Sequence, residues 1–481
     1  MSNLKRLFKH TFIYGIATVL PRFLSLFLTP LYVDLLPTSD YGIYSGLLAY
    51  LIMGNVLLSY GMETAFFRFM NKNADRKKVQ STALSSLFIS SLVFFVVAWL
   101  LRENIARWIR YDEAFVSYSI AILTLDALVV IPFAWFRNEG KPVRYAVVKI
   151  GNVGVNLLLN LFLFLLLPKL AENGNFWNNL IFENKVHYIF IANLTASLLT
   201  FLVLLPIYFK IRLGLSRLLL SQMLRYAYPV LIAGIAFSIN EGFDRIFLRM
   251  LLPADTADTT IGIYAACYKM GVFMTLFVTA YKLGVEPFFF SNAKEKDAPQ
   301  TYASVTLYFT IFGSFVLLFV TVFTDWLKYL LIPNSDYWEA LWIVPIILLA
   351  NLCLGIYHSL SVWYKVTDRT NYGAIISVVG AVITIIANFT LIPLWSYKGA
   401  ALATLAAYSS MLLISYCIGQ KKYPIPYSLQ KIGLYFGYSV IASLLVFYVF
   451  NRTLLIGVFF LVGYLLMVFF LEKRTFRLKK T

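Results

Sequence analysis

The sequence predicts an all-α integral membrane protein with about 14 transmembrane helices, arranged as two pseudo-symmetric six-helix lobes plus two C-terminal helices. Three observations support this fold class. Of the 481 residues, 60% are hydrophobic and only 13% are charged, whereas water-soluble chains carry about 25% charged residues. Apolar segments of about 20 residues, long enough to cross a bilayer, follow one another along the chain. Short motifs also recur in the same order in two parts of the chain, which indicates an internal repeat.

The expected spans are joined by short loops. In chain order they cover residues 10–34, 41–67, 79–101, 114–136, 143–168, 186–208, 227–252, 262–290, 301–323, 339–364, 371–393, 398–419, 430–450 and 453–471. These loops leave no room for an extramembrane catalytic domain, and no glycine-rich phosphate-binding loop is present. We therefore expect no enzymatic activity and no direct use of ATP.

Paired motifs define the repeat. The triplet GIY at 42–44 recurs at 262–264, and GMETAFF at 61–67 corresponds to GVEPFFF at 284–290, so Glu63 and Glu286 take matching positions. A second set pairs WFR at 135–137 with WYK at 363–365, followed by Tyr145, Asn160 and Pro168 in one copy and by Tyr372, Asn388 and Pro393 in the other. Repeats of this kind indicate a transporter with a substrate path between two halves.

The repeat also predicts the domain organisation. The N-terminal lobe covers 1–208 (helices 1–6), a cytoplasmic linker covers 209–226, the C-terminal lobe covers 227–420 (helices 7–12), and 421–481 holds helices 13–14 and a basic tail. Because six helices separate the copies, both run in the same sense across the membrane, as in a parallel repeat.

Basic residues predict the orientation. With the N-terminus placed inside, far more Lys and Arg fall in inner segments, such as Arg76, Lys77 and Lys78, than in outer loops. Such an excess marks cytoplasmic loops, so we expect a multi-pass protein of the bacterial inner membrane with both termini cytoplasmic. The same loops account for the net charge of +18, and nucleic acid is not expected as a partner.

Cations inside the expected spans are candidate substrate ligands, because a cation at the bilayer centre costs about 2.5–3.5 kcal/mol and usually faces a cavity. The substrate-binding candidates are Arg22, Arg245, Arg249, Lys269 and Lys282. Two further cations, Arg68 and Lys149, lie near the predicted inner face, where snorkelling is an equally good explanation. For Arg245 the alternative is a structural ion pair with Glu241 or Asp244. An excess of cations predicts an anionic cargo, such as a phosphate or an acidic sugar.

Four acidic residues are candidates for coupling to an ion gradient or for a structural latch. They are Glu63, Asp126, Glu241 and Glu286. A buried carboxylate suits a proton site, so a proton or sodium gradient is the expected energy source. As a latch, Glu63 would pair with Arg68, and Glu286 with Lys282. No spacing of Cys and His typical of a metal site occurs, and no cofactor is expected.

Several stretches together resemble a known family. They are LLPTSDYGIYSGLL (35–48), GMETAFFRF (61–69), RNEGKPVRYAVVKIGNVGVNLLLNL (137–161), LRYAYPVLIAGIAFSINEGFDRIFL (224–248), GIYAACYKMG (262–271) and ANFTLIPLWSYKGAALATLAAY (387–408). In order and spacing they resemble polysaccharide and O-antigen flippases of the multidrug/oligosaccharidyl-lipid/polysaccharide exporter superfamily.

This resemblance implies a two-lobed fold like that of the multidrug exporters, working by alternating access. It also implies transfer of an undecaprenyl-diphosphate-linked oligosaccharide to the periplasmic leaflet, beside other membrane proteins of polysaccharide assembly. Relatives use cavity cations to hold the diphosphate or an acidic sugar, and Arg22, Arg245, Arg249 and Lys269 fit by location.

Other functions compete with this prediction. A drug exporter of the same fold should have an acidic or aromatic cavity, and a flippase for lipid-linked peptidoglycan precursors would differ only in cargo. An O-antigen polymerase or ligase needs a long periplasmic loop, which the short loops oppose. A scaffold within an assembly complex is the remaining alternative.

Overall fold

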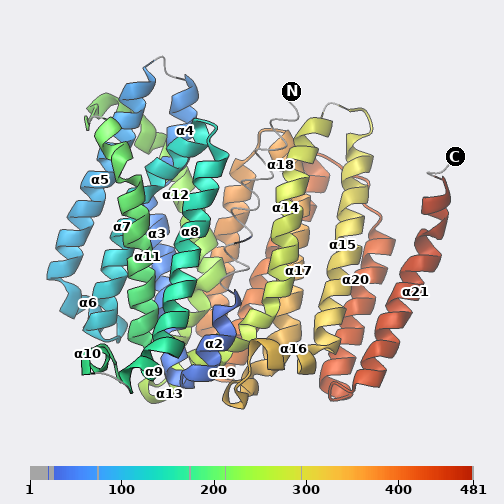
Figure 1. The fold of residues 1–481 in the computed structure, drawn as a ribbon. Helices are drawn as coiled ribbons and strands as arrows, with labels where there is room; N and C mark the ends of the chain where they lie inside the picture. Colours follow the sequence, from blue (N-terminus) through green and yellow to red (C-terminus); the bar gives the residue numbers. More distant parts are fainter. Residues whose placement is uncertain are drawn as a thin grey trace. The chain divides into compact units, whose positions relative to one another are not determined.

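The protein is described from a computed structural model, which covers residues 20, 26–72, 75–172, 175–211, 213–293 and 295–478. Throughout these ranges the regular secondary structure is helical, and 12 helical segments among them are long and apolar enough to cross a membrane (Figure 1). The chain divides into two compact units, Met1–Ile246 and Phe247–Thr481, called unit 1 and unit 2 below. The predicted all-α membrane fold is confirmed.

The difference between 12 segments and the 14 expected has a simple origin. Helix α19 (Asn371–Lys422) contains two of the expected spans, 371–393 and 398–419, which meet at Ser396. The backbone there has φ 50° and ψ −133°, which is not helical, so α19 consists of two helices joined at a kink. The first expected span, 10–34, lies mostly outside the described residues, and its last part forms α2 (Leu28–Leu35).

Unit 1 is a bundle of long helices joined by short ones. Its elements are α2, α3 (Thr38–Ser59), α4 (Met62–Lys72), α5 (Arg76–Leu100), α6 (Arg102–Ile109), α7 (Glu113–Asn138), α8 (Pro142–Leu161), a π-helical turn (Phe162–Leu166), α9 (Leu167–Ala171), α10 (Asn175–Asn178), α11 (Val186–Lys210) and most of α12 (Arg217–Leu251). Helix α7 is central, because it packs against α3, α5, α8 and α11.

Helix α12 begins inside the segment expected as a linker. It starts at Arg217 and continues past the boundary between Ile246 and Phe247. Most of the helix, including the second half of the expected linker, therefore belongs to unit 1.

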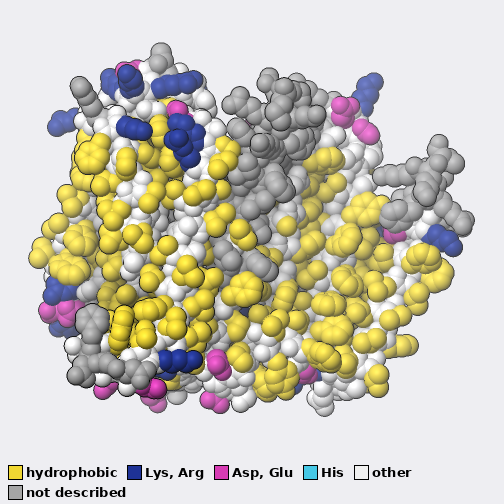
Figure 2. All heavy atoms as spheres, in the orientation of Figure 1, with side chains coloured by type: hydrophobic (Ala, Val, Ile, Leu, Met, Phe, Trp, Pro, Cys, Tyr) yellow, Lys and Arg dark blue, Asp and Glu magenta, His cyan; other side chains and the backbone are white. Residues whose placement is uncertain are grey.

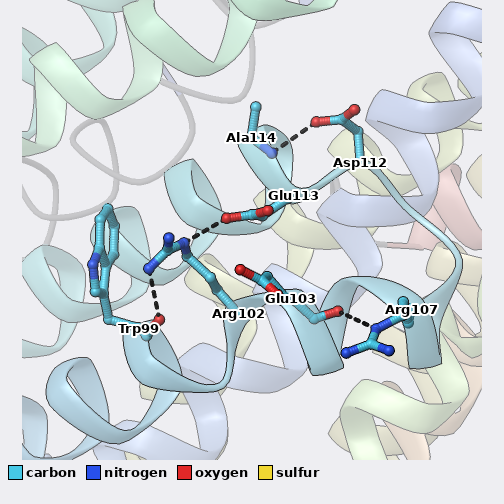
Figure 3. Close-up of polar contacts among 7 residues, drawn as sticks. All are labelled: Trp99, Arg102, Glu103, Arg107, Asp112, Glu113 and Ala114. Carbon is cyan, nitrogen blue, oxygen red and sulfur yellow. Dashed lines mark hydrogen bonds and ion pairs between the residues drawn. The ribbon is translucent and has the colours of Figure 1, made fainter.

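The corner between α5 and α7 shows how polar groups end and begin helices (Figure 3). Arg102 donates from Nε to Glu113 Oε1 at 2.6 Å, and its guanidinium lies 5.2 Å from the centroid of the Trp99 ring. The Asp112 carboxylate caps α7 by accepting from the Ala114 amide at 2.7 Å, a typical role for aspartate at a helix start. This segment was expected as an outer loop, and the structure folds part of it into α6.

The second expected span is broken at its glycine. Tyr60 and Gly61 both have positive φ, 33° and 71°, and separate α3 from α4. A Cβ atom at position 61 would lie 2.8 Å from the Ala227 carbonyl oxygen of α12, so only glycine fits this close approach. The matching Gly284 lies inside the continuous helix α14 (Val272–Asn292), so the hinge is present in only one copy of the repeat.

Unit 2 contains the last part of α12 and the remaining helices. They are α13 (Ala254–Tyr268), a 3₁₀ turn (Lys269–Gly271), α14, α15 (Ala298–Val322), α16 (Thr324–Leu331), a 3₁₀ segment (Ser335–Ile343), α17 (Val344–Leu360), α18 (Val362–Val366), α19, α20 (Leu429–Leu444), a π-helical turn (Leu445–Val449) and α21 (Leu454–Leu478). The two C-terminal helices, α20 and α21, pack on α15. Tyr464 of α21 donates to the Ile311 carbonyl of α15 at 2.8 Å, and buried Glu472 accepts from Lys431 at 2.8 Å.

The flanks of the helices are apolar. Figure 2 shows hydrophobic side chains covering the sides of the unit 1 helices, with Lys and Arg side chains gathered at the end of the bundle where α4 lies. An apolar flank with charged ends is the pattern of a protein whose solvent is the lipid bilayer.

Candidate functional site

Unit 1 contains a cavity of about 520 Å³, a volume typical of small-molecule binding sites. Helices α3, α4, α7, α8, α11 and α12 all contribute to its wall. Its polar lining residues are Asn55, Ser59, Glu63, Thr64, Asp126, Lys149, Asn152, Asn193, Ser197 and Thr200. Thr64 is exposed, so the cavity is open at that end.

The cavity lies between two hydrophobic clusters of unit 1. Along α11, Phe190 belongs to one cluster and Leu204 to the other, and the polar residues Asn193, Ser197 and Thr200 lie between them. Their spacing of four and three residues places them on one face of the helix. Along α7, Asp126 similarly falls between Leu123 and Val129, which belong to the two clusters. The sequence therefore builds a polar layer within an apolar bundle.

Asp126 is held by neutral hydrogen-bond donors. Its Oδ1 accepts from Ser197 Oγ at 2.8 Å, and the Asn55 side chain is a second hydrogen-bond partner. Beside it, Asn152 Nδ2 donates to Thr200 Oγ1 at 2.9 Å. A carboxylate within a membrane span that faces a cavity and is held by neutral groups is suited to reversible binding of a proton or cation.

Lys149 is the cation of the cavity. Its Nζ lies 4.5 Å from the centroid of the Phe133 ring, a cation–π distance. Within the described residues Lys149 forms no ion pair and no hydrogen bond through Nζ. An ammonium group has three donors, so Lys149 retains hydrogen-bonding capacity where it lines the cavity.

Each unit has one ion pair at matching positions of the repeat. In unit 1, Arg137 donates to Glu63 Oε1 at 2.7 Å. In unit 2, Lys365 donates to Glu286 Oε1 at 2.5 Å. For Glu63 the partner expected from sequence, Arg68 on the same helix, is therefore wrong, and for Glu286 the structure adds a partner from another helix. The pairs instead join the repeated Gly-x-Glu motif to the repeated aromatic-basic motif.

Arg68 has a different environment. Its guanidinium lies 4.0 Å from the centroid of the Tyr226 ring at the exposed end of α4. It does not line the cavity.

The polar cavity itself is not duplicated. With Glu63 and Glu286 in register, Asn55 corresponds to Val278, which is buried in unit 2. The aromatic-basic motifs and the following tyrosines then place Leu354 opposite Asp126 and the fully buried Ile376 opposite Lys149. The repeat thus preserves the ion pair but not Asn55, Asp126 and Lys149, while the same register places Lys282 opposite Ser59. This combination of polar residues is therefore particular to unit 1.

A second duplicated feature is a pair of buried asparagines. Asn160 and Asn388 are both fully buried, and each donates Nδ2 to the carbonyl four residues earlier, at 2.8 and 2.7 Å. Within the described structure the Oδ1 atom of each has no hydrogen-bond partner.

The predicted substrate cations are divided between the units. Arg22 lies outside the described residues. Arg245 belongs to unit 1, where its guanidinium lies 3.8 Å from the buried carboxylate of Asp244. Arg249, in unit 2, forms an ion pair with Asp258 of α13, and Lys269 occupies the 3₁₀ turn between α13 and α14.

Lys282 belongs to a group of basic side chains in unit 2. Lys282 and Lys365 both lie close enough to His358 for their charges to act on its ring. Glu286 is bonded to Lys365 and provides a carboxylate there. The two lysines beside one glutamate give these three side chains a formal charge of +1, as expected for an anion site.

The predicted acids also have distinct environments. Glu63 and Glu286 lie in the duplicated ion pairs, Asp126 lies in the cavity, and Glu241 is exposed on α12.

Sequence reasoning missed most of the cavity. It noted Lys149 but did not include it among the substrate-binding candidates, and it did not consider Asn152 or the polar residues of α11. A usable pattern was present, because Lys149 and Asn152 are three residues apart on α8 and therefore share a face, as do the polar residues of α11.

Solved structures share this fold. The lipid II flippase MurJ in an inward closed conformation matches with a TM-score of 0.68 at 13% identity, over 95% of this chain and 99% of that one. An inward-facing multidrug resistance MATE family transporter of the MOP superfamily gives 0.62 at 12% identity, over 85% and 94%. A MOP superfamily transporter from Pyrococcus furiosus, described as having a binding pocket of reverse polarity, gives 0.56 at 12% identity, over 86% and 95%.

Sequence comparisons are more specific about the family. No curated protein matches the chain at a significant level. The family model described as polysaccharide biosynthesis protein matches residues 7–292, which is more than half of the chain and includes all of unit 1 from residue 7 onward. This match identifies the chain as a member of the polysaccharide biosynthesis protein family.

Proposed function

We propose that the protein is a flippase that moves an undecaprenyl-diphosphate-linked oligosaccharide across the inner membrane by alternating access. The observation that carries this proposal is the polar cavity of unit 1, which lies among membrane-spanning helices. A sugar head group cannot cross hydrocarbon unaided, because burying its polar and charged groups without partners costs several kcal/mol per group. A polar, lined cavity lowers that barrier. The repeat unit of an O-antigen, capsule or exopolysaccharide is the class of cargo that fits the family.

The diphosphate is assigned to the basic residues Arg22, Arg245, Arg249, Lys269 and Lys282. The surroundings of Lys282 support this assignment, because Lys365 places a second cation near the same histidine, His358. Arg249 has a carboxylate partner in Asp258, which favours a positioning role over direct binding. The Asp258 carboxylate offsets part of the Arg249 charge, so the attraction of Arg249 for an anionic ligand is weaker.

Asp126 is the proposed coupling residue for a proton or sodium gradient. Alone among the four predicted acids, it combines a position inside a membrane span with a place in the cavity wall and neutral hydrogen-bond partners. Glu63 and Glu286 are assigned to the latch instead, since each already has a cation partner.

Two alternatives share the fold. A multidrug exporter of this fold is the second candidate function, and the polar wall around Asp126 is the feature that fits it. Lys149 in the same wall opposes it, because it would repel an organic cation. A flippase for a lipid-linked peptidoglycan precursor differs from the proposed function in its cargo, and the surroundings of Lys282 suit both.

A proteoliposome assay tests the proposal. A fluorescent undecaprenyl-diphosphate oligosaccharide is supplied in one leaflet, and its transfer is measured for wild type, Lys282→Ala and Lys328→Ala. Lys328 is the control, since it is a lysine bonded to Asp325 in the short helix α16 and is not one of the predicted substrate cations. We expect wild type and Lys328→Ala to transfer the lipid, and Lys282→Ala to lose at least tenfold.

Transfer by none of the three proteins, combined with export of a small organic cation, would overturn the flippase assignment. Equal transfer by all three would keep the assignment and remove Lys282 from the diphosphate site. In the same vesicles, Asp126→Asn should abolish the dependence on a proton or sodium gradient while transfer down the lipid's own gradient remains.

A further inference from the structure

We propose that the unit 1 cavity is a sugar subsite, which binds an uncharged hydroxylated ring of the cargo and leaves the diphosphate outside. This inference rests on the proposed function and assigns one part of the lipid-linked oligosaccharide to one set of residues. Charge balance, free hydrogen-bonding capacity and the asymmetry of the repeat support it.

The net charge of the cavity side chains favours the neutral sugar over the diphosphate as the ligand. Two acidic side chains, Asp126 and Glu63, line the cavity together with one lysine, Lys149. Arg137 neutralises Glu63 at the cavity edge, so the formal charges of these four groups cancel. A diphosphate carries at least two negative charges and would meet no net positive charge here. An organic cation would meet Lys149. A neutral polar ligand encounters neither penalty.

Two side chains of the cavity wall have hydrogen-bonding groups without a partner among the described residues. Asn193 forms no hydrogen bond through its side chain with any described residue, and the Lys149 ammonium forms none through Nζ. An amide offers donors and an acceptor, and an ammonium offers three donors. Sugar hydroxyls both donate and accept, so such a mixture of groups suits them. Burying polar groups among apolar clusters without a ligand or water to satisfy them would be costly.

The apolar part of the wall completes a sugar site. Val129, Val130, Val230 and Leu231 line the cavity with Phe133. A pyranose ring presents C–H groups on its faces and hydroxyls at its edge. A wall that combines both kinds of side chain can contact the ring faces and the hydroxyls together.

The asymmetry of the repeat argues against a purely structural role. At the matching positions unit 2 has Val278, Leu354 and Ile376 instead of Asn55, Asp126 and Lys149. Unit 2 folds with apolar residues at these three positions, so the fold does not require polar residues there. Binding of a ligand explains why unit 1 has polar residues at these positions.

The test compares two cargo lipids in proteoliposomes. One is a fluorescent polyprenyl diphosphate that carries a disaccharide of N-acetylhexosamine, and the other is the same lipid without sugar. The variants are Asn193→Leu and Lys149→Met. Thr195→Val is the control on α11, because Thr195 bonds to the Ile191 carbonyl of its own helix at 2.8 Å and does not line the cavity.

We expect Asn193→Leu and Lys149→Met to slow transfer of the glycosylated lipid about tenfold, since each removes at least one hydrogen bond to the sugar. Transfer of the sugar-free lipid should not change, and Thr195→Val should resemble wild type with both lipids. Equal losses with both lipids, or no loss with either, would overturn the sugar subsite while leaving the flippase assignment intact.

A binding measurement separates the two proposals. The free disaccharide is added to the full-length protein in detergent, and contact is detected by saturation-transfer NMR. Contact with wild type that is lost in Asn193→Leu supports the subsite even if no lipid is transferred, in which case the flippase assignment fails alone. No contact with wild type at millimolar disaccharide overturns the subsite.

Discussion

At the scale of single residues, the side chains with the most informative surroundings are Asp126 and Lys149. Both lie in apolar spans where an ionisable residue is expensive, and the fold brings both to one cavity. Asp126 is held by hydrogen bonds from its neighbours, whereas Lys149 lies over the face of Phe133, within reach of the charges of Asp126 and Glu63, and forms no hydrogen bond through Nζ with the described residues. This difference separates a carboxylate fixed in place from a cation that remains available.

Replacing Lys149 should lower transport activity without lowering stability. Lys149→Met keeps the length of the side chain and removes a cation that forms no ion pair among the described residues. We expect the thermal unfolding midpoint in detergent to stay constant or rise by a few degrees, because the desolvation cost of the charge disappears. Transport of the glycosylated lipid should fall. A midpoint that drops by more than about 5 °C would mean that Lys149 has a mainly structural role.

At the scale of elements, the duplicated ion pairs show what the repeat conserves. Glu63 and Arg137 join α4 to the end of α7, and Glu286 and Lys365 join α14 to α18. In both units the acid follows a glycine by two residues, and the residue three after it, Phe66 or Phe289, is buried. An equivalent ion pair therefore joins the corresponding helices in each unit.

A double-mutant cycle measures the unit 1 pair. We expect Glu63→Gln, Arg137→Gln and their combination to give a coupling free energy of about 1 kcal/mol or less, because both side chains are about two-fifths exposed and water screens the pair. The readout is the thermal unfolding midpoint in detergent, together with transport of the lipid.

The Arg102–Glu113 pair is the matched control, with a similar distance and exposure but no copy in the predicted repeat. If the duplicated pair is a latch for transport, Glu63→Gln should reduce transport and Glu113→Gln should not. Equal effects on transport would show that the duplicated pair acts only through stability.

The kink of α19 allows a prediction about backbone strain. Ser396 has φ 50° and ψ −133°, a conformation that glycine adopts far more readily than serine. We expect Ser396→Gly to stabilise the protein by about 1 kcal/mol. Ser377→Gly, within the regular part of the same helix, should destabilise it by roughly 1 kcal/mol. Opposite shifts of the unfolding midpoint would confirm the strain, whereas a loss of stability in both would contradict it.

At the scale of the whole molecule, function is unevenly distributed over the two units. Unit 1 holds the polar cavity, and unit 2 holds the basic group around Lys282 together with the two C-terminal helices. We infer that the two related units contribute different chemistry to the proposed transport cycle, a polar pocket from one and positive charge from the other.

Cysteine labelling tests the predicted orientation in the membrane. In a variant without Cys267, Cys353 and Cys417, single cysteines are introduced at Lys78 and at Arg107, both of which are exposed. An impermeant maleimide added to intact cells should label Arg107→Cys but reach Lys78→Cys only after the membrane is opened, because the basic start of α5 is expected inside. The reverse pattern would place the termini outside.

Much of the fold follows from composition and periodicity. Charge content and runs of apolar residues determined the membrane class and nearly every span, because the hydrocarbon thickness sets the length of a spanning helix. The π-helical turn after α8 and the kink at Ser396 could not be predicted, since both depend on how these helices are packed and not on local propensity.

The sequence by itself determined that this is a helical membrane protein with an internal repeat, and it identified both ends of each ion pair as repeated motifs. It paired Glu63 with the wrong cation and missed Lys365 as a partner of Glu286, because neighbours on one helix are visible in a sequence and neighbours on another helix are not. Only the tertiary structure decided that Arg137 and Lys365 are the partners, and that Asp126 and Lys149 share a cavity. The physical reason is that polar residues spread over six helices become one site only when packing brings their faces together.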